Sequence, residues 1–233
     1  MTWVKICGMT NLEDALVAVE AGADAVGFVF YEKSPRCVTV ETAREIVGKL
    51  PERVEKVGVF VGSTREVVSV ACNRAGLTLA QTYVDARIPA SRLDDEFLEN
   101  LPCPAIVAFR ASQFLQGESD DPDVITGFHV QNKIRDRIAA MLLDSGTTDR
   151  PGGTGQRFDW RNAALVKDSL DRIGLSLIVA GGLTSDNVTE AIEILRPWGV
   201  DVASGVEARP GKKDPEKVRA FVRAVREMDR KSV

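Results

Sequence analysis

The residues with the clearest chemical potential lie near the start of the chain, where an apolar segment ends in a thiol. Residues 3–7 have the pattern of a short strand, and Thr10 with Glu13 has the spacing of a helix capping box. Because side chains alternate along a strand, Lys5 and Cys7 fall on one face. A cation beside a thiol favours the thiolate, which is the reactive form. The alternative for Cys7 is a small buried hydrophobe.

Two further polar residues follow apolar segments. Asp144 comes directly after the run 138–143, and alternation turns it to the same side as Leu142 while Leu143 packs on the other side. Such a carboxyl can act as an acid, although a solvated carboxylate or helix cap is the alternative. Arg36 follows Pro35 in a polar loop and is suited to bidentate capture of a carboxylate. Its alternative is an ordinary surface arginine.

Glycine pairs mark the ends of the last two apolar runs. Gly181-Gly182 follows one run and Ser204-Gly205 follows the next. Glycine lets backbone N–H groups approach phosphate oxygens closely, so these turns predict a phosphate site. The segment 152–155 is also glycine-rich, but it lacks the lysine and the flanking strand of a P-loop. We expect a mobile lid there.

The elements that must position these residues form a regular series. Most of the apolar runs are separated by helical patterns, and they cover 3–7, 25–30, 56–61, 78–83, 105–109, 138–143, 175–180 and 200–203. Ser63 with Glu66 predicts another capping box, and Asp214-Pro215 starts a last amphipathic helix. Near-continuous apolar strands indicate a parallel sheet, and eight units favour an α/β fold of the (β/α)₈ TIM-barrel type. We expect one domain over 1–233, with an irregular fifth β/α unit at 111–137.

Composition excludes several function classes. The net charge is −4 and the pI about 5.3, so no nucleic-acid partner is expected. The cysteines at 7, 37, 72 and 103 lack C-x-x-C spacing, and with His129 as the single histidine a zinc site has too few ligands. We interpret His129 as structural or exposed. The chain has neither a leader pattern nor a run of roughly 20 apolar residues, so we expect a soluble cytoplasmic protein without a membrane partner.

Taken together, several motifs resemble the phosphoribosylanthranilate isomerase family of tryptophan biosynthesis. The matching segments are Lys5-Ile6-Cys7-Gly8-Met9-Thr10, Lys33-Ser34-Pro35-Arg36, Leu142-Leu143-Asp144-Ser145, Gly152-Gly153-Thr154-Gly155 with Phe158-Asp159-Trp160, Ala180-Gly181-Gly182-Leu183 and Asp201-Val202-Ala203-Ser204-Gly205-Val206-Glu207. The resemblance implies an Amadori rearrangement of a small phosphorylated substrate, without a cofactor. It implies that Asp144 is the general acid and Cys7 the general base.

The resemblance also implies how the substrate is held. Arg36 would bind the anthranilate carboxylate. The remaining binding residues would be Gln81, Gly181, Gly182, Asp201, Ser204 and Gly205, with the glycine turns at the phosphate. If Asp144 were not the acid, Asp201 or Glu207 would be the next candidates. Contact with neighbouring enzymes of the pathway is left open.

One segment departs from the family pattern. The family usually reads Gln-Leu-His-Gly after the fourth strand, whereas this chain reads Gln81-Thr82-Tyr83-Val84. A tyrosine can still donate a hydrogen bond into the barrel mouth. This departure leaves open a catalytically weak or silent barrel that only binds such a ligand. A separate alternative is another phosphosugar isomerase of amino-acid biosynthesis, against which Cys7 on the first strand argues.

Overall fold

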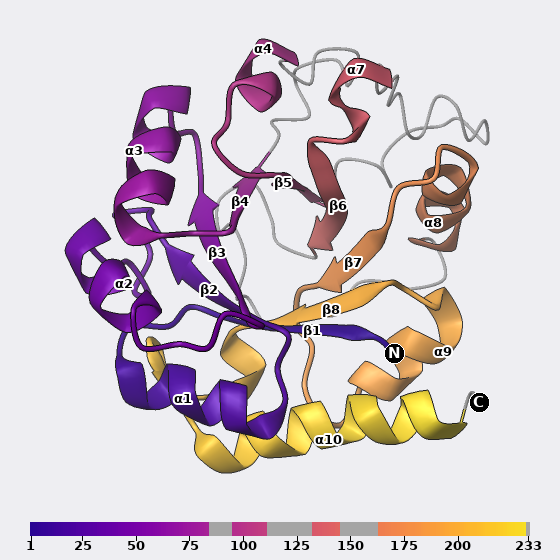
Figure 1. The fold of residues 1–233 in the computed structure, drawn as a ribbon. Helices are drawn as coiled ribbons and strands as arrows, with labels where there is room; N and C mark the ends of the chain where they lie inside the picture. Colours follow the sequence, from indigo (N-terminus) through magenta and orange to yellow (C-terminus); the bar gives the residue numbers. More distant parts are fainter. Residues whose placement is uncertain (84–94, 111–131, 145–162, 232–233) are drawn as a thin grey trace.

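The fold is a closed barrel of parallel strands in chain order (Figure 1). The computed structural model describes residues 1–83, 95–110, 132–144 and 163–231. The barrel strands are β1 (Trp3–Cys7), β2 (Ala25–Val29), β3 (Glu55–Phe60), β4 (Leu79–Tyr83), β5 (Ala105–Arg110), β6 (Ile138–Asp144), β7 (Leu177–Ala180) and β8 (Gly199–Val202). Pairing of β1 with both β2 and β8 closes the barrel. The (β/α)₈ prediction is confirmed, and each predicted strand lies within about two residues of an observed one.

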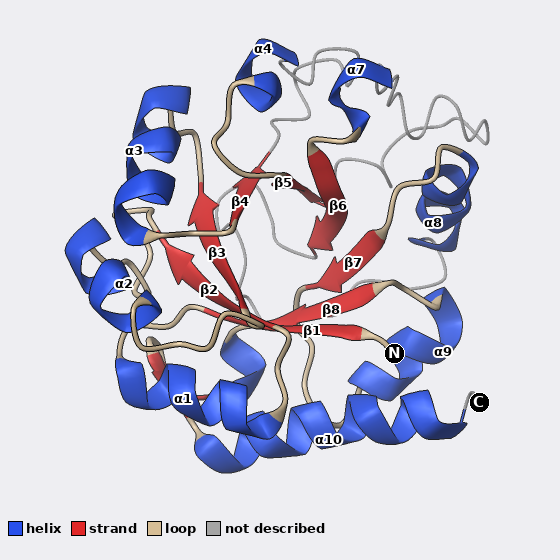
Figure 2. Ribbon diagram, viewed as in Figure 1, coloured by secondary structure: helices blue, strands red, loops and turns tan. Residues whose placement is uncertain are grey.

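Helices surround the outside of the barrel (Figure 2). They are α1 (Leu12–Ala21), α2 (Val40–Val47), α3 (Arg65–Ala75), α4 (Asp95–Glu99), α7 (Asn132–Arg135), α8 (Ala163–Arg172), α9 (Val188–Leu195) and α10 (Pro215–Lys231). After β8 a short 3₁₀ turn, η2 (Ser204–Val206), leads to the antiparallel strands β9 (Glu207–Arg209) and β10 (Lys212–Lys213). None of the helices in the described ranges is long and apolar enough to cross a membrane.

Two predicted helix caps are wrong by one residue. Asn11, not Thr10, caps α1, and its side chain accepts a hydrogen bond from the Asp14 amide at 2.9 Å. The Thr10 hydroxyl instead donates to the Gly211 carbonyl at 2.6 Å, a contact distant in sequence that no local pattern reveals. At α3, Thr64 rather than Ser63 is the cap. Asn, Thr and Ser are all favourable N-cap residues, so the sequence alone does not decide which of two neighbouring candidates caps the helix.

Alternation along the strands separates an outer part of the core from two clusters inside the barrel. Val4, Ile6 and Leu143 belong to the shell between the strands and the helices. The barrel interior holds a separate cluster of mostly small side chains: Ala25, Val57, Ile106, Ala108, Ala140, Leu142, Ile178 and Ala180. Above it lies a third group formed by Cys7, Val29 and Val59. Inward-facing residues at the carboxyl ends of the strands therefore line the mouth of the barrel.

Three expectations concern segments that lie wholly or partly outside the described residues. The glycine-rich segment 152–155, expected to be a lid, lies wholly outside them, and so does His129. Of the segment 111–137, expected to be irregular, only 132–137 is described. It holds the four-residue helix α7 and leads directly into β6.

Candidate active site

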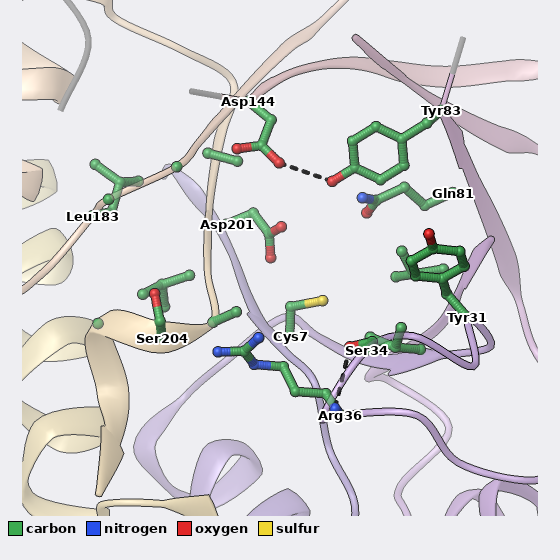
Figure 3. Close-up of a pocket in the computed structure, with 18 of the residues that line it drawn as sticks. Cys7, Tyr31, Ser34, Arg36, Gln81, Tyr83, Asp144, Leu183, Asp201 and Ser204 are labelled. Carbon is green, nitrogen blue, oxygen red and sulfur yellow. Dashed lines mark hydrogen bonds between the residues drawn. The ribbon is translucent and has the colours of Figure 1, made fainter. Parts of the chain in front are cut away.

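A pocket opens at the carboxyl ends of the barrel strands (Figure 3). It is lined by the residues that the resemblance assigns to catalysis or substrate binding: Cys7, Arg36, Gln81, Asp144, Gly181, Gly182, Asp201, Ser204 and Gly205. Tyr31, Ser34 and Tyr83 also line it. In Figure 3, Cys7 and Arg36 lie on one side of the pocket and Asp144 on the other, beside Tyr83.

Cys7 is the last residue of β1 and is 7% exposed. The facing position on β2 is Gly27, where an added Cβ would lie 2.7 Å from the Cys7 sulfur and 3.1 Å from Lys5 Cε. A side chain at position 27 would therefore displace the thiol or the ammonium beside it. The small residue on β2 leaves the room that both groups occupy.

The pKa of Cys7 reflects burial as well as the expected cation. Burial raises the pKa of the Cys7 thiol above its ordinary value, and the Lys5 ammonium opposes this effect only in part. The carboxylate of Asp201 raises the pKa of Cys7 further. Lys5 therefore favours the thiolate as expected, but the burial effect is larger and the net pKa of Cys7 is raised. Alternation identified the neighbouring cation but not the cost of removing the thiol from water.

Lys5 is fully buried inside the barrel and pairs with Asp201. Its Nζ donates to Asp201 Oδ1 at 2.9 Å, and the two residues are direct partners in the register of β1 and β8. Burial alone would lower the pKa of Lys5, but Asp201 and Cys7 together raise it above its ordinary value. The ion pair therefore keeps the Lys5 ammonium next to the Cys7 thiol and fixes the Asp201 side chain in the wall of the pocket.

Arg36 is held by a carboxylate that the sequence analysis considered only as a reserve acid. Glu207 accepts from Arg36 Nε at 2.8 Å and from Arg36 Nη2 at 2.7 Å. These hydrogen bonds raise the pKa of Arg36 above its ordinary value. Burial would raise the pKa of Glu207, but Arg36 and Lys213 lower it below its ordinary value. Glu207 is therefore an ionised orienting group rather than a proton donor.

Lys213 joins this ion pair to the end of β1. It is 1% exposed, and its Nζ donates to Glu207 Oε1 at 3.1 Å, to the Cys7 carbonyl at 2.6 Å and to the Ala203 carbonyl at 3.1 Å. Burial lowers its pKa, which Glu207 opposes. Lys213 thus ties the carboxyl ends of β1 and β8 together around the residues that face the pocket.

The glycine turns after β7 and β8 lie against one another. Gly181 and Gly182 have φ values of +89° and +64°, which side chains rarely adopt. A Cβ at Gly205 would lie 1.8 Å from the Leu183 carbonyl oxygen, so only glycine allows the two loops to pack this closely. Buried Asn187 braces the first loop by donating to the Gly182 carbonyl and accepting from the Thr184 amide.

Asp144 and Gln81 face the pocket from β6 and β4. Asp144 is 3% exposed, and its Oδ2 accepts a hydrogen bond of 2.9 Å from the Tyr83 hydroxyl. Gln81 is 1% exposed, and within the described part of the chain its Oε1 has no hydrogen-bond partner. An acceptor of this kind in a pocket wall is suited to a hydroxyl of a bound ligand.

Sequence reasoning missed Lys213, Asn187 and the orienting role of Glu207. The contact between Lys213 and Cys7 spans 206 positions, so no local pattern contains it. Asn187 could have been noticed as a cap-forming residue before the apolar stripe of α9, although its side chain braces the loop instead.

Comparison with known protein families agrees with this geometry. The family model for N-(5'-phosphoribosyl)anthranilate (PRA) isomerase matches residues 4–224. The chain is 44% identical to the N-(5'-phosphoribosyl)anthranilate isomerase of Geotalea uraniireducens over 223 residues, covering 96% of this chain and 98% of that protein. It is 45% identical to the one of Geobacter sulfurreducens over 224 residues, again covering 96% and 98%.

Solved structures give the same result. Phosphoribosyl anthranilate isomerase from Thermotoga maritima superposes with a TM-score of 0.76 at 35% identity, covering 97% of this chain and 100% of that one. A phosphoribosyl anthranilate isomerase in complex with reduced 1-(o-carboxyphenylamino)-1-deoxyribulose 5-phosphate has a TM-score of 0.74 at 35% identity, with the same coverage.

Proposed function

The chain belongs to the phosphoribosylanthranilate isomerase family of tryptophan biosynthesis, and from this premise we propose a mechanism for it. N-(5-phosphoribosyl)anthranilate becomes 1-(2-carboxyphenylamino)-1-deoxyribulose 5-phosphate, with Asp144 as general acid and Cys7 as general base. The reaction is an internal redox isomerisation, so the atoms of the substrate and the product are the same. Two positioned proton-transfer groups are sufficient for this chemistry.

The first step opens the sugar ring. Asp144 gives its proton to the ring oxygen, the bond between that oxygen and C1 breaks, and the nitrogen lone pair forms a C1=N iminium. Asp144 is then a carboxylate. Its near-complete burial supports the assignment, because a carboxyl away from bulk water directs its proton to the substrate.

In the second step C1 is reduced and C2 is oxidised. Cys7 reacts as a thiolate, formed when the thiol loses its proton to solvent before the cycle begins. The thiolate removes the C2 proton, and the electron pair of that bond neutralises the iminium to give an enaminol, which tautomerises to the ketone. One proton then passes from Cys7 back to Asp144 through solvent, which restores the starting pair. The raised pKa of Cys7 makes its thiolate a minor form at neutral pH but a stronger base once formed.

Two anionic anchors would fix the ribose between the acid and the base. Arg36 would bind the anthranilate carboxylate, while Glu207 keeps the guanidinium in one orientation. The turns at Gly181-Gly182 and Ser204-Gly205 would bind the phosphate through backbone N–H groups. Gln81 and Asp201 would contact the sugar hydroxyls. Holding a substrate at both ends lowers the entropic part of the barrier.

One observation carries the proposal. Cys7 from β1 and Asp144 from β6 enter one pocket, and Arg36 and the glycine turns line the same pocket (Figure 3). A barrel that only binds an anionic sugar would need the anchors but not a thiol and a carboxyl facing the same space.

Replacement of Asp144 by Asn tests the acid. Asp144→Asn keeps the size of the side chain but removes its transferable proton, so kcat should fall by about 10²–10⁴-fold. Affinity for the reduced product should stay within about twofold, because the lost interaction belongs to the transition state. Decay of substrate fluorescence measures turnover. Asp136→Asn is the matched control, since Asp136 is exposed just before β6, at the opposite end of that strand. Unchanged turnover with weakened binding would reduce Asp144 to a positioning role.

A further inference from the structure

Tyr83 reaches the candidate acid from a strand that does not neighbour it. It is the last residue of β4, and its inward side chain packs against the clusters inside the barrel. Its hydroxyl donates to Asp144 Oδ2 at 2.9 Å across the top of β5, which separates β4 from β6 (Figure 3). The hydrogen bond from the Tyr83 hydroxyl therefore restrains the orientation of the Asp144 carboxyl group.

The Tyr83 ring is itself held in place. The Arg110 guanidinium lies 5.8 Å from the ring centroid, within the range of a cation–π contact. Arg110 is also the residue on β5 that stands in register with Asp144. The ring is thus fixed by packing on one side and by a cation from the intervening strand.

The direction of this hydrogen bond is set by charge. Burial raises the pKa of the Tyr83 phenol well above its ordinary value, and the Asp144 carboxylate raises it further. Tyr83 therefore keeps its proton at neutral pH. The phenol is the donor, and Asp144 is the acceptor.

From this geometry we propose that Tyr83 is a positioning residue for the acid: it orients the Asp144 carboxyl and stabilises the carboxylate left when Asp144 gives up its proton. The inference rests on the proposed role of Asp144 as general acid. A phenol donates a stronger hydrogen bond to a carboxylate than to a neutral carboxyl. The stabilisation therefore grows as the proton leaves, which favours the transition state over the bound substrate.

The first measurement separates turnover from binding in the full-length protein. Tyr83→Phe removes the hydroxyl and keeps the ring, so the contact with Arg110 remains. We expect kcat to fall by about 3–30-fold, the difference between a neutral and a charge-assisted hydrogen bond. The Kd of reduced 1-(o-carboxyphenylamino)-1-deoxyribulose 5-phosphate should change by less than about twofold, since no proton moves in that complex. Loss of binding with unchanged kcat would overturn the inference.

A double-mutant cycle then tests whether Tyr83 acts through Asp144. In the Asp144→Asn background no carboxylate forms, so Tyr83→Phe should change kcat by less than about twofold. Tyr31→Phe is the matched control, because Tyr31 is the other tyrosine of the same pocket. Whatever effect Tyr31→Phe has on the wild type should persist in the Asp144→Asn background.

The outcomes distinguish this inference from the assignment on which it rests. If Asp144→Asn lowers kcat by about 10²–10⁴-fold but the Tyr83→Phe and Asp144→Asn losses multiply in the double variant, Tyr83 acts independently and the inference fails alone. An Asp144→Asn variant with nearly unchanged kcat removes the proposed acid and the inference together.

Discussion

Two ion pairs beside the pocket combine burial with a direct ionic contact. Lys5 with Asp201 and Arg36 with Glu207 are both nearly removed from water. Buried ion pairs often contribute little net stability, because desolvation offsets the attraction. Their contribution here is orientation, because the pairs hold the side chains of Asp201 and Arg36 in place at the pocket.

Removing the Arg36 side chain tests the carboxylate anchor. Arg36→Ala should weaken binding of the reduced product by about 1.5–3 kcal/mol, the size of a charge-assisted hydrogen bond. Glu207 keeps its ion pair with Lys213 in this variant, so the surrounding fold should persist. Titration calorimetry gives the affinity, and inorganic phosphate is the control ligand, which should bind as before. An equal loss of phosphate affinity would place Arg36 at the phosphate instead.

The direction of the pKa shift of Cys7 can be measured. Only the thiolate reacts with iodoacetamide, so in the folded protein the alkylation rate of Cys7 should rise at a higher pH than in the urea-unfolded chain. Lys5 and Lys213 lower the pKa of Cys7, whereas burial and Asp201 raise it. Lys5→Met should therefore move the rise to still higher pH. Peptide mass spectrometry separates Cys7 from the other cysteines. A folded-state rise below that of the unfolded chain would contradict the assignment.

At the residue scale, the sequence predicted which side chains meet but not their protonation or their partners. The alternation of side chains along the strands was sufficient to predict that Cys7 and Asp144 face the same pocket. It contained nothing about Lys213, which approaches Cys7 from the other end of the chain. The effect of Lys5 on the pKa of Cys7 followed from this alternation, but the larger effect of burial did not, since desolvation depends on the whole surrounding structure.

Among the elements, strands were the most predictable because most of them are largely apolar runs followed by glycine or polar residues. The eight runs all became barrel strands, and α10 begins at Pro215 as expected. The hairpin of β9 and β10 was not predicted, because its two short strands carry charged side chains and no apolar pattern. That hairpin nevertheless supplies Glu207 and Lys213 to the site.

The close packing of the loops after β7 and β8 can be tested at Gly205. In Gly205→Ala the new Cβ meets the Leu183 carbonyl oxygen, so the two loops must separate. Inorganic phosphate affinity should fall, because the backbone N–H groups of the two turns move apart, and the free energy of unfolding should fall by about 1–3 kcal/mol, the usual cost of overpacking. Gly48→Ala is the matched control, because Gly48 has a φ of −62° and ordinary contacts. Unchanged phosphate binding in Gly205→Ala would show that the phosphate site lies elsewhere.

For the whole molecule, closure of the barrel is what assembles the site. β1 pairs with β8, so Cys7 and the β9–β10 hairpin become neighbours although they lie near opposite ends of the sequence. The far ends of the chain are joined as well, since the Thr2 amide donates to the Asp229 carboxylate of α10 at 2.9 Å. The carboxyl ends of the strands thereby form one rim, at which the proposed substrate anchors and proton-transfer groups line one pocket.

The most direct test of this account is the turnover number of Cys7→Ala, followed by decay of substrate fluorescence. The variant removes the only group assigned to take the C2 proton, so kcat should fall by about 10²–10⁴-fold while the reduced product binds with nearly unchanged affinity. Cys37→Ala, which changes an exposed thiol, is the matched control and should turn over like the wild type. A Cys7→Ala turnover number within a few-fold of the wild-type value would contradict the account, because the base would then have to be another group.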